Sequence, residues 1–208
     1  MLSITVCFIW SAVPAQQKAF VPDLSKVNDT SMWIVHNRSA TFNDGELTLN
    51  GKEGDGLVLL KNYSFSNGKI ELDIKGKDDR GRSFVGIAFH AINDSTYDAI
   101  YFRAFNFRNP ERKGHSLQYI SMPSFDWEKL RIENYGEYEN SISAAPNPND
   151  WFHVTIEVKY PFVKVYVNNA KDPSLQISVL SPHKKGKLGF FVGNNSEGRF
   201  KNLKIYAE

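Results

Sequence analysis

Hydrophobic and polar residues alternate with a period of two along almost the whole chain after Gln16. Such alternation is typical of β-strands that bury one face, because successive side chains of a strand point to opposite sides. Turns rich in Asn, Asp and Gly separate the segments, and no helical period lies between them, which favours an antiparallel sandwich or barrel. The expected strands lie between residues 83 and 107, which hold two, and at residues 32–36, 40–42, 46–49, 57–60, 70–75, 117–122, 151–158, 162–167, 175–180, 188–192 and 203–206.

The two strands between residues 83 and 107 combine an apolar face with a face of small, aromatic and cationic residues. The apolar positions are Val85, Ile87, Phe89, Ile100, Phe102 and Ala104. The opposite positions are Gly86, Ala88, His90, Tyr101, Arg103 and Phe105. Small residues beside hydrogen-bond donors and an aromatic ring leave room for a ligand, so this second face is a candidate binding surface. An ordinary solvated sheet face with scattered aromatics is the alternative interpretation.

Two long polar segments interrupt the alternation, at residues 106–116 and 123–150. Long connections in a compact domain often carry binding residues. In the second segment Ser124 can cap a short helix over residues 126–130, with Trp127 and Leu130 on one side. We expect both segments to fold over one mouth of the sandwich.

The first fifteen residues are uncharged and resemble an export signal, with Val13 and Ala15 placed as the small residues of a cleavage site before Gln16. The segment departs from the usual pattern because no Lys or Arg precedes the apolar run, and a buried N-terminal strand is the alternative. Cys7, the only cysteine, lies inside it, so the mature chain would have no disulfide, which fits a bacterial periplasm or surface. Residues 16–208 then form one domain.

The net charge is +2, from 25 basic and 23 acidic residues spread along the chain. This balance gives no reason to expect nucleic acid as a partner, and it favours a neutral ligand. No run after the first segment reaches the ~20 apolar residues of a membrane-spanning helix. The sequence does not determine the oligomeric state.

The sequence holds few signatures of metal or nucleophilic chemistry. The five histidines show no zinc-ligand spacing, and no G-x-S-x-G or Gly-rich phosphate loop is present, so we expect no cofactor. A structural calcium ion is the exception that we consider, although Asn and Asp also occur in turns for conformational reasons. Its candidate ligands are Asn43, Asp44, Asn93, Asp94, Asn194 and Glu197.

Four segments together resemble a concanavalin A-like lectin/glucanase jelly roll. They are ATFNDGELTLNG at 40–51, GLVLLKNYSFSNGKIELDIKG at 56–76, DWFHVTIEV at 150–158 and KLGFFVGNNSEGRFKNLKI at 187–205. The nearest resemblance is to the bacterial 3-keto-disaccharide hydrolase domain, with laminin G-like modules as more distant relatives. The resemblance covers almost all of the chain after about Asp29 and implies a two-sheet antiparallel β-sandwich with a carbohydrate-related role. It fixes the fold better than the activity.

Glycoside hydrolase family 16 shares this fold and uses a strand motif with carboxylates at both ends. Here Glu71 and Asp73 occupy the first part of such a motif, but Lys75 follows where a second carboxylate is needed. We therefore expect no ordinary retaining β-glucanase activity. Alternating charges on a half-exposed strand are the other explanation for Glu71 and Asp73.

A carbohydrate site needs aromatic faces and planar hydrogen-bonding groups. One quarter of the chain supplies both, and its candidate substrate-binding residues are Tyr101, Arg103, Phe105, Phe107, Arg108, His115, Gln118, Tyr119 and Trp127. Trp127 and Tyr119 can equally be core residues. The candidate catalytic residues are Glu71, Asp73, His90, Glu111, Asp126 and Glu128, with His115 as a further base. The sequence thus leaves two functions open: an exported carbohydrate-active hydrolase, or a non-catalytic carbohydrate-binding or surface-interaction module.

Overall fold

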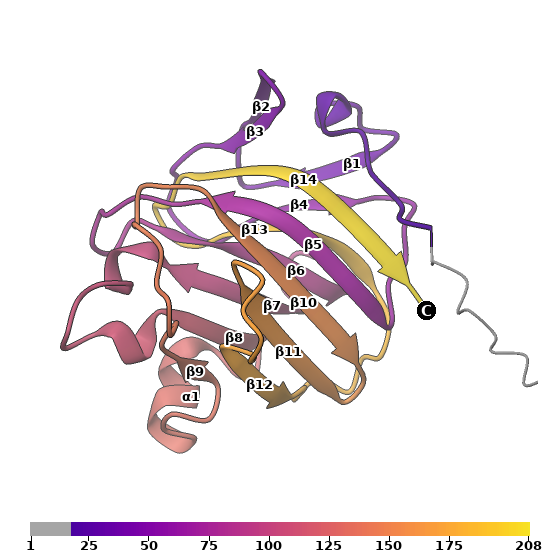
Figure 1. Cartoon of the computed structure of the whole chain (residues 1–208). Helices are drawn as coiled ribbons and strands as arrows, with labels where there is room; N and C mark the ends of the chain where they lie inside the picture. Colours follow the sequence, from indigo (N-terminus) through magenta and orange to yellow (C-terminus); the bar gives the residue numbers. More distant parts are fainter. Residues whose placement is uncertain (1–17) are drawn as a thin grey trace, which may run out of the picture.

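The computed structural model describes residues 18–208 and contains two seven-stranded antiparallel sheets packed face to face (Figure 1). In spatial order, sheet I holds β12 (Leu175–Ser178), β11 (Phe162–Val167), β10 (Phe152–Lys159), β5 (Gly68–Lys75), β14 (Gly198–Ala207), β3 (Glu46–Leu49) and β2 (Ala40–Asn43). Sheet II holds β1 (Trp33–His36), β4 (Gly56–Leu60), β13 (Lys187–Val192), β6 (Phe84–Ala91), β7 (Tyr97–Arg103), β8 (Leu117–Met122) and β9 (Glu139–Asn140). The predicted two-sheet β-sandwich is confirmed. The predicted export segment at 1–15 lies outside the described residues.

Sheet I buries one face and leaves the other partly exposed, as its alternating sequence predicts. In β5 the side chains of Ile70, Leu72 and Ile74 are fully buried, while the residues between them are half-buried. Strands β10 and β11 pair from Val154 opposite Val167 to Lys159 opposite Phe162, so their valines line the same interior face. Each such buried side chain contributes about 1.5–3 kcal/mol of hydrophobic free energy.

Sheet II differs because its central strands are buried on both faces. Every residue of β4 and β7 is buried, and so is every residue of β6 after the first. The inner face packs against sheet I, and the outer face is covered by side chains from the connecting segments. A sheet whose strands are buried on both faces must be covered on its outer side as well. A ligand hollow can form on this side, between the sheet and the segments that cover it.

The small residues of β6 have a role different from the one expected. A Cβ atom at Gly86 would overlap the carbonyl oxygen of Ile100 and lie 2.6 Å from the Cα of Tyr101. Gly86 therefore permits a close approach of β6 and β7 and does not open room for a ligand.

His90 does not lie on the ligand-facing side of β6, and this corrects the sequence prediction. A backbone φ of 49° and a register shift between β6 and β13 rotate its side chain into the protein, where it is fully buried. Its Nε2 atom lies 2.7 Å from the carbonyl oxygen of Ser66, and its Nδ1 atom lies 3.3 Å from Oδ2 of Asp98. The hydroxyl of Tyr119 donates to the other oxygen of Asp98 at 2.7 Å. His90 and Tyr119 thus form part of a buried polar network, remote from solvent.

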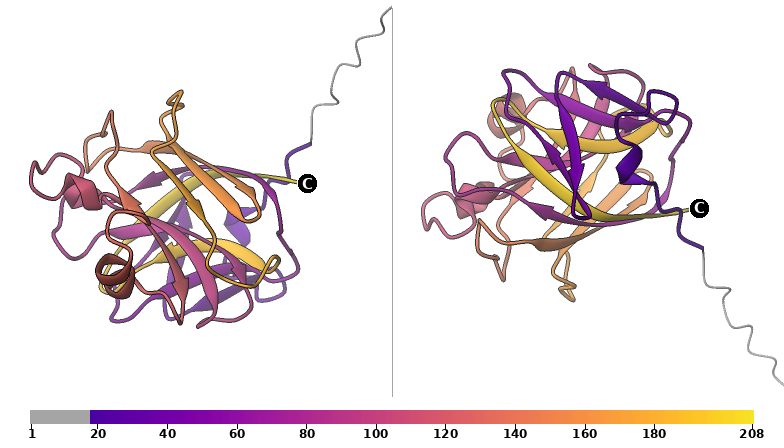
Figure 2. Two further views of the ribbon diagram at one scale, coloured as in Figure 1. Left: turned by 90° about the horizontal axis from the view of Figure 1, so that it is seen from below. Right: turned by 90° about the horizontal axis from the view of Figure 1, so that it is seen from above.

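The longest helix of the described residues is α1 (Trp127–Glu133), which follows β8 and lies at the end of the molecule opposite the C-terminus (Figure 2). Asp126, rather than Ser124, caps it by accepting hydrogen bonds from the backbone amides of Glu128 and Lys129. The described residues also include three single-turn 3-10 helices, at Leu24–Lys26, Ala104–Asn106 and Lys113–His115. Within residues 18–208, none of the helices has the length and apolar character needed to cross a membrane.

Candidate functional site

A groove lies on the covered outer face of sheet II, at the end where α1 packs. It consists of two adjoining hollows of about 90 Å³ and about 410 Å³, which share Phe84, Trp127 and Asn194. The narrow hollow is also lined by Asp55, Tyr101, Ile120, Phe191 and Gly193. The wide hollow is also lined by Arg80, Gly81, Arg103, Phe105, Asn106, Arg112, His115 and Arg131. Ligand sites commonly have volumes of roughly 300–1,000 Å³.

Aromatic rings line the groove along its length. Tyr101 packs against Phe191 with ring centroids 5.4 Å apart, and Phe84 meets Tyr101 and Phe105 edge to face at 6.1 Å and 5.5 Å. Trp127 projects from the first turn of α1 and is 45% exposed. Tyr101 and Phe191 are buried, whereas Trp127 is exposed and Phe84 and Phe105 are half-buried. The last three therefore offer ring surface against which the apolar face of a sugar can pack.

Asp55 places a carboxyl group in the narrow hollow. Its Oδ2 atom accepts a hydrogen bond from the hydroxyl of Tyr97 at 3.1 Å. Burial raises the pKa of Asp55, and although the Tyr97 hydrogen bond, the charge of Arg38 and a hydrogen bond from the Asn194 backbone oppose this, the net pKa lies above the ordinary value. A carboxyl group of this kind in a concave site can act as a general base closer to neutral pH than an exposed aspartate.

Arg38 fixes the loop that carries Asp55. Its guanidinium donates to the carbonyl oxygens of Asn37, Gly54 and Gly193 at 2.6, 2.7 and 2.9 Å. Gly56 follows Asp55 directly, and a Cβ atom there would collide with the Arg38 side chain. Gly56 therefore lets the backbone run close to Arg38, which ties the loop to the end of β13.

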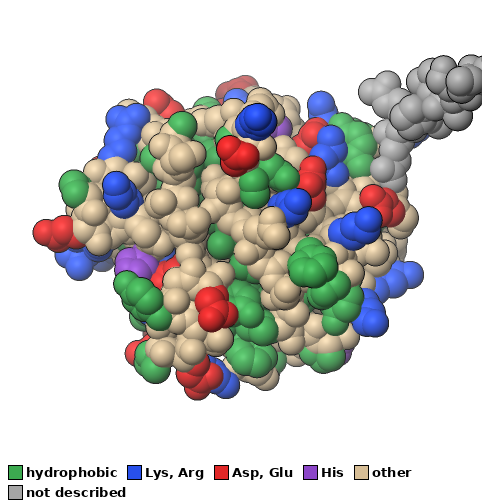
Figure 3. Space-filling view, turned by 60° about the horizontal axis from the view of Figure 1, so that its bottom comes forward, with side chains coloured by type: hydrophobic (Ala, Val, Ile, Leu, Met, Phe, Trp, Pro, Cys, Tyr) green, Lys and Arg blue, Asp and Glu red, His purple; other side chains and the backbone are tan. Residues whose placement is uncertain are grey.

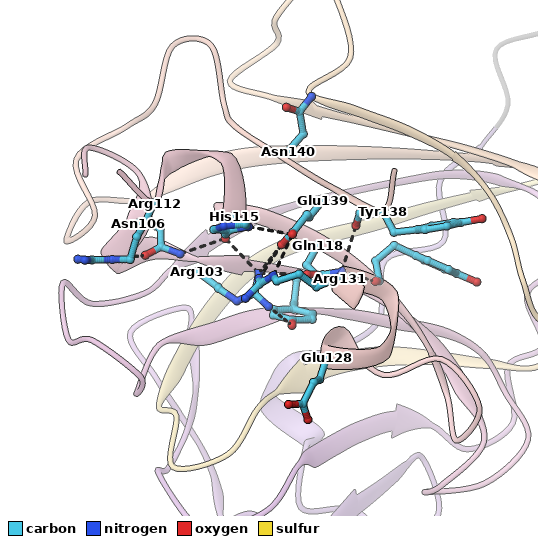
Figure 4. Close-up of polar contacts among 12 residues, drawn as sticks. Arg103, Asn106, Arg112, His115, Gln118, Glu128, Arg131, Tyr138, Glu139 and Asn140 are labelled. Carbon is cyan, nitrogen blue, oxygen red and sulfur yellow. Dashed lines mark hydrogen bonds and ion pairs between the residues drawn. The ribbon is translucent and has the colours of Figure 1, made fainter. Parts of the chain in front are cut away.

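The wide hollow has a network of buried charges at its base (Figure 4). Glu139 on β9 receives two hydrogen bonds from Arg131, of 3.0 Å and 2.7 Å, and its Oε1 atom lies 2.8 Å from Nδ1 of His115. Arg103 lies 3.5 Å from the other oxygen of Glu139 and donates to the hydroxyl of Tyr101 at 2.8 Å and to Gln118 Oε1 at 3.1 Å. Residues from β7, β8, β9 and α1 are thus held in one arrangement.

The network sets the protonation of its members. Burial raises the pKa of Glu139, but the hydrogen bonds and charges of Arg131 and His115 outweigh it, and the net pKa falls below the ordinary value. Burial raises the pKa of Tyr101 to about 12, against the opposing charge of Arg103. At neutral pH, Glu139 is therefore ionised and Tyr101 retains its proton.

The structure places most of the predicted substrate-binding residues at this groove. Those that line it are Tyr101, Arg103, Phe105, His115 and Trp127, and Gln118 lies beneath it in the charged network. Arg103 is only 5% exposed and lies 3.5 Å from the buried carboxylate of Glu139, so it lines the groove as a largely buried residue. Phe107 is buried against Phe102 and Phe152, and Arg108 is exposed outside the groove.

The predicted catalytic carboxylates lie elsewhere. Glu71 and Asp73 are on the outer face of sheet I, where they contact Lys69 at 2.6 Å and His153 at 2.8 Å. Asp126 is engaged as the helix cap, and the carboxylate of Glu128 lies apart from the bonded network in Figure 4. Glu111 is exposed and does not line the groove. These placements favour the structural explanation for Glu71 and Asp73.

Sequence reasoning missed the two carboxylates that matter most for this groove, Asp55 and Glu139, together with Arg80, Arg112 and Arg131. Asp55 lies between two glycines directly before a fully apolar strand, a position that indicates a constrained loop at a sheet end. No sequence pattern pointed to Glu139, because β9 has only two residues and so shows no alternation of polar and apolar positions.

The calcium prediction is not tested by the structure. Asn43 ends β2 and Asp44 begins the turn to β3, while Asn93 and Asp94 lie in the turn between β6 and β7. Asp94 is 3.0 Å from Nδ1 of His36, and Asn93 accepts a hydrogen bond from the backbone amide of Ser95. Within the described part of the chain, no three His, Cys, Asp or Glu residues gather as a metal-binding group.

The surface around the α1 end mixes side chains of every kind. On the face drawn in Figure 3, hydrophobic side chains gather in separate patches within a surface of other side chains and backbone, and charged side chains of both signs are scattered around them. This face therefore lacks the one large apolar patch that marks a protein-binding surface. The groove is the candidate ligand site.

Comparison with known families and structures gives a consistent assignment. The profile of the 3-keto-alpha-glucoside-1,2-lyase-like domain matches residues 23–206. Among proteins with curated descriptions, none matches this chain.

Solved structures share the fold at low sequence identity. The carbohydrate binding module CBM66 from Bacillus subtilis is 17% identical, with a TM-score of 0.61 over 83% of this chain and 94% of that chain. A candidate glycosyl hydrolase from Parabacteroides distasonis is 16% identical, with a TM-score of 0.56 over 92% of this chain and all (100%) of that chain. The exoplasmic/lumenal domain of VIP36, bound to Ca²⁺ and Man3GlcNAc, is 13% identical, with a TM-score of 0.59 over 86% of this chain and 84% of that chain.

Proposed function

The chain belongs to the family of 3-keto-alpha-glucoside-1,2-lyase-like domains, and on this premise we propose that its groove binds a 3-keto glycoside and cleaves it by elimination across C1 and C2. The observation that supports this proposal is the position of Asp55. A carboxyl group with a raised pKa lines the same hollow as the rings of Tyr101 and Trp127. A group that removes a proton from carbon next to a ketone needs these properties.

Both proton transfers take place at the narrow hollow, which Asp55 and Tyr101 line. Asp55 takes the proton from C2, which is acidic because the ketone at C3 can hold the electron pair as an enolate. The electrons of the broken C2–H bond form the C1–C2 double bond, and the bond from C1 to the glycosidic oxygen breaks. The leaving oxygen takes a proton from Tyr101, whose hydroxyl accepts from Arg103 and keeps its own hydrogen available.

The cationic residues stabilise the negative charge that develops on the oxygen of the C3 ketone. Arg103 and Arg131 line the wide hollow next to the narrow one, and both are held in place by Glu139. Preorganised positive groups stabilise an enolate oxygen more than the neutral ketone, which lowers the barrier. Because Glu139 balances part of this charge, the site keeps two guanidinium groups close together without strong mutual repulsion.

The test uses a 4-nitrophenyl 3-keto-α-glucoside and the matching unoxidised glucoside. We expect release of nitrophenol from the keto compound alone, together with an unsaturated sugar product that NMR detects. Deuterium at C2 should slow the reaction, whereas hydrolysis would show little effect. Asp55→Asn should abolish turnover, and the exposed neighbour Glu53, changed to Gln, provides the matched control.

A non-catalytic carbohydrate-binding module is the second candidate. The exposed ring of Trp127 and the open groove favour it, since a module needs aromatic contacts and no base. Sugar binding without turnover of any 3-keto glycoside, unchanged in Asp55→Asn, would select this alternative.

We propose further that the protein is exported to the bacterial periplasm or cell surface. Residues 1–15 support this, since they are uncharged and end in small residues suited to cleavage. Expression in a secreting host followed by N-terminal sequencing should give Gln16 as the first residue, and an intact Met1 would count against export.

A further inference from the structure

The wide hollow of the groove is lined by cationic side chains with little opposing charge. Four arginines and one histidine line it, namely Arg80, Arg103, Arg112, Arg131 and His115. Among the described residues that line this hollow, none carries a carboxylate. Glu139 is only 5% exposed and contacts Arg103, Arg131 and His115 from beneath, so a single buried carboxylate lies at the base of a hollow lined by four guanidinium groups.

Two of these arginines have no acidic partner. Arg112 donates from Nε to the side-chain oxygen of Asn106 at 3.4 Å, which is a weak neutral contact. Arg80 is exposed, and neither Arg80 nor Arg112 forms an ion pair with any residue of the described chain. Their positive charges are therefore available to a ligand, whereas those of Arg103 and Arg131 are partly taken up by Glu139.

Acidic and basic side chains lie in different hollows of the groove. Asp55 lies in the narrow hollow, and the unpaired guanidinium groups lie in the wide one, with Trp127, Phe84 and Asn194 common to both. A sugar that stacks on the shared aromatic residues with C1 and C2 toward Asp55 directs another part of the ligand toward Arg80 and Arg112. That part meets positive charge.

We propose that the ligand of this groove is an anionic sugar, with a carboxylate or a sulfate ester that Arg80 and Arg112 bind. This inference rests on the proposed function and specifies its substrate class. The net charge of the whole chain, +2, favoured a neutral ligand, but it averages over a surface of mixed sign. The local arrangement reverses that expectation, because a ligand responds to the charges that line its own site.

Arginine suits such a group for geometric reasons. The planar guanidinium presents two parallel N–H bonds that match the two oxygens of a carboxylate, and such bonds are roughly twice as strong as neutral hydrogen bonds. Carboxylate recognition therefore favours a hexuronate over an unmodified hexose. A sulfate ester offers the same charge in a tetrahedral form, and the experiment separates the two.

The test measures calorimetric binding of the full chain to methyl α-D-glucoside, methyl α-D-glucuronide and methyl α-D-glucoside 6-sulfate. We expect an anionic sugar to bind at least about tenfold more tightly than the neutral one, the effect of one charge-assisted hydrogen bond. The preference should shrink as salt is raised. Arg112→Gln and Arg80→Gln should each reduce it, while Arg108→Gln, an exposed arginine of the same segment outside the groove, should leave it unchanged.

The outcomes separate this inference from the proposed function. Equal affinity for the neutral and anionic sugars, with the 3-keto glucoside still cleaved, overturns the anionic ligand and leaves the lyase proposal intact. Tighter binding of the sulfate than of the glucuronide identifies the sulfate ester as the anionic group. If no sugar binds and no 3-keto glycoside is cleaved, both proposals fail.

Discussion

Arg103 and Glu139 form a buried ion pair across β7 and β9, with Nη1 and Oε2 3.5 Å apart and each residue 5% exposed. The pair joins the last residue of a central strand to a two-residue edge strand, which otherwise pairs with β8 at Asn140 and Glu139. Arg131 and His115 contact the same carboxylate, so Glu139 positions three side chains at once. The geometry of the wide hollow depends on this one side chain.

Glu139→Gln should lower the free energy of unfolding by about 3 kcal/mol, because it leaves Arg103 buried without a compensating charge. The deficit should be largest near neutral pH. The carboxylate has a lowered pKa in the folded state, so its stabilisation is present above the unfolded-state pKa and is lost as pH falls through the folded-state pKa. Urea unfolding at several pH values measures both effects.

The exposed Glu137, two residues earlier, gives the matched control, and Glu137→Gln should leave stability unchanged. A Glu139→Gln variant as stable as the parent at neutral pH would show that the network contributes no net stability.

Trp127→Ala should weaken sugar binding by about threefold to tenfold while changing stability little. The indole is 45% exposed and stacks beneath Arg131 at 5.1 Å, so it has a free ring surface and little core packing to lose. Titration followed by NMR measures the affinity. Ile132→Ala on the same helix removes a side chain that is 75% exposed outside the groove, and it should have no effect on affinity. Loss of folding in Trp127→Ala would identify the residue as a core residue instead.

The fold was predictable from sequence because strand alternation is a local property. The predicted strands at 46–49, 117–122 and 162–167 coincide with β3, β8 and β11. The last strand is longer than predicted, since Asn202, with a φ of 57°, and a register shift between Lys201 and Lys204 interrupt the alternation. A bulge also explains why the sequence predicted the wrong face for His90, because one extra residue moves a side chain to the other face of the sheet.

The site was only partly predictable because its parts come from distant segments. Tyr101, Arg103 and Trp127 could be selected as ring and donor groups from one stretch of sequence. Asp55 and Glu139 reach the groove only through sheet pairing, and nothing local shows that β9 lies beside β8. Likewise, Arg103 could be placed on the outer face from its alternation, but its burial depends on Glu139 and α1, which the strand pattern does not contain.

Glu71→Gln should leave activity toward any 3-keto glycoside unchanged. Glu71 lies on the outer face of sheet I, paired with Lys69, and the groove lies on the outer face of sheet II. Its carboxylate therefore cannot reach a sugar bound there. Laminarin and lichenan should also remain uncleaved by the parent protein, and robust cleavage that Glu71→Gln abolishes would show that the sheet I face is catalytic.

Tyr97→Phe should shift the acidic limb of the pH–rate profile to higher pH. The Tyr97 hydroxyl donates to the ionised carboxylate of Asp55 and so opposes the rise in pKa that burial causes. Without that hydrogen bond, Asp55 holds its proton over a wider pH range and acts as a base only at higher pH. The rate well above this range should stay close to that of the parent, because the carboxylate is then ionised in both proteins.

Tyr97→Phe should also change stability, because the ionisation of Asp55 affects stability in the opposite direction to that of Glu139. A carboxyl group whose pKa is raised on folding binds its proton more tightly in the folded state, so stability decreases as pH rises through the folded-state pKa of Asp55. Removing the Tyr97 hydroxyl raises that pKa further, and the deficit of Tyr97→Phe against the parent should therefore grow with pH. Tyr166→Phe, which removes a hydroxyl donated to Glu157 on sheet I, is the matched control. A Tyr97→Phe variant with an unmoved acidic limb and full activity would mean that Asp55 is not the base.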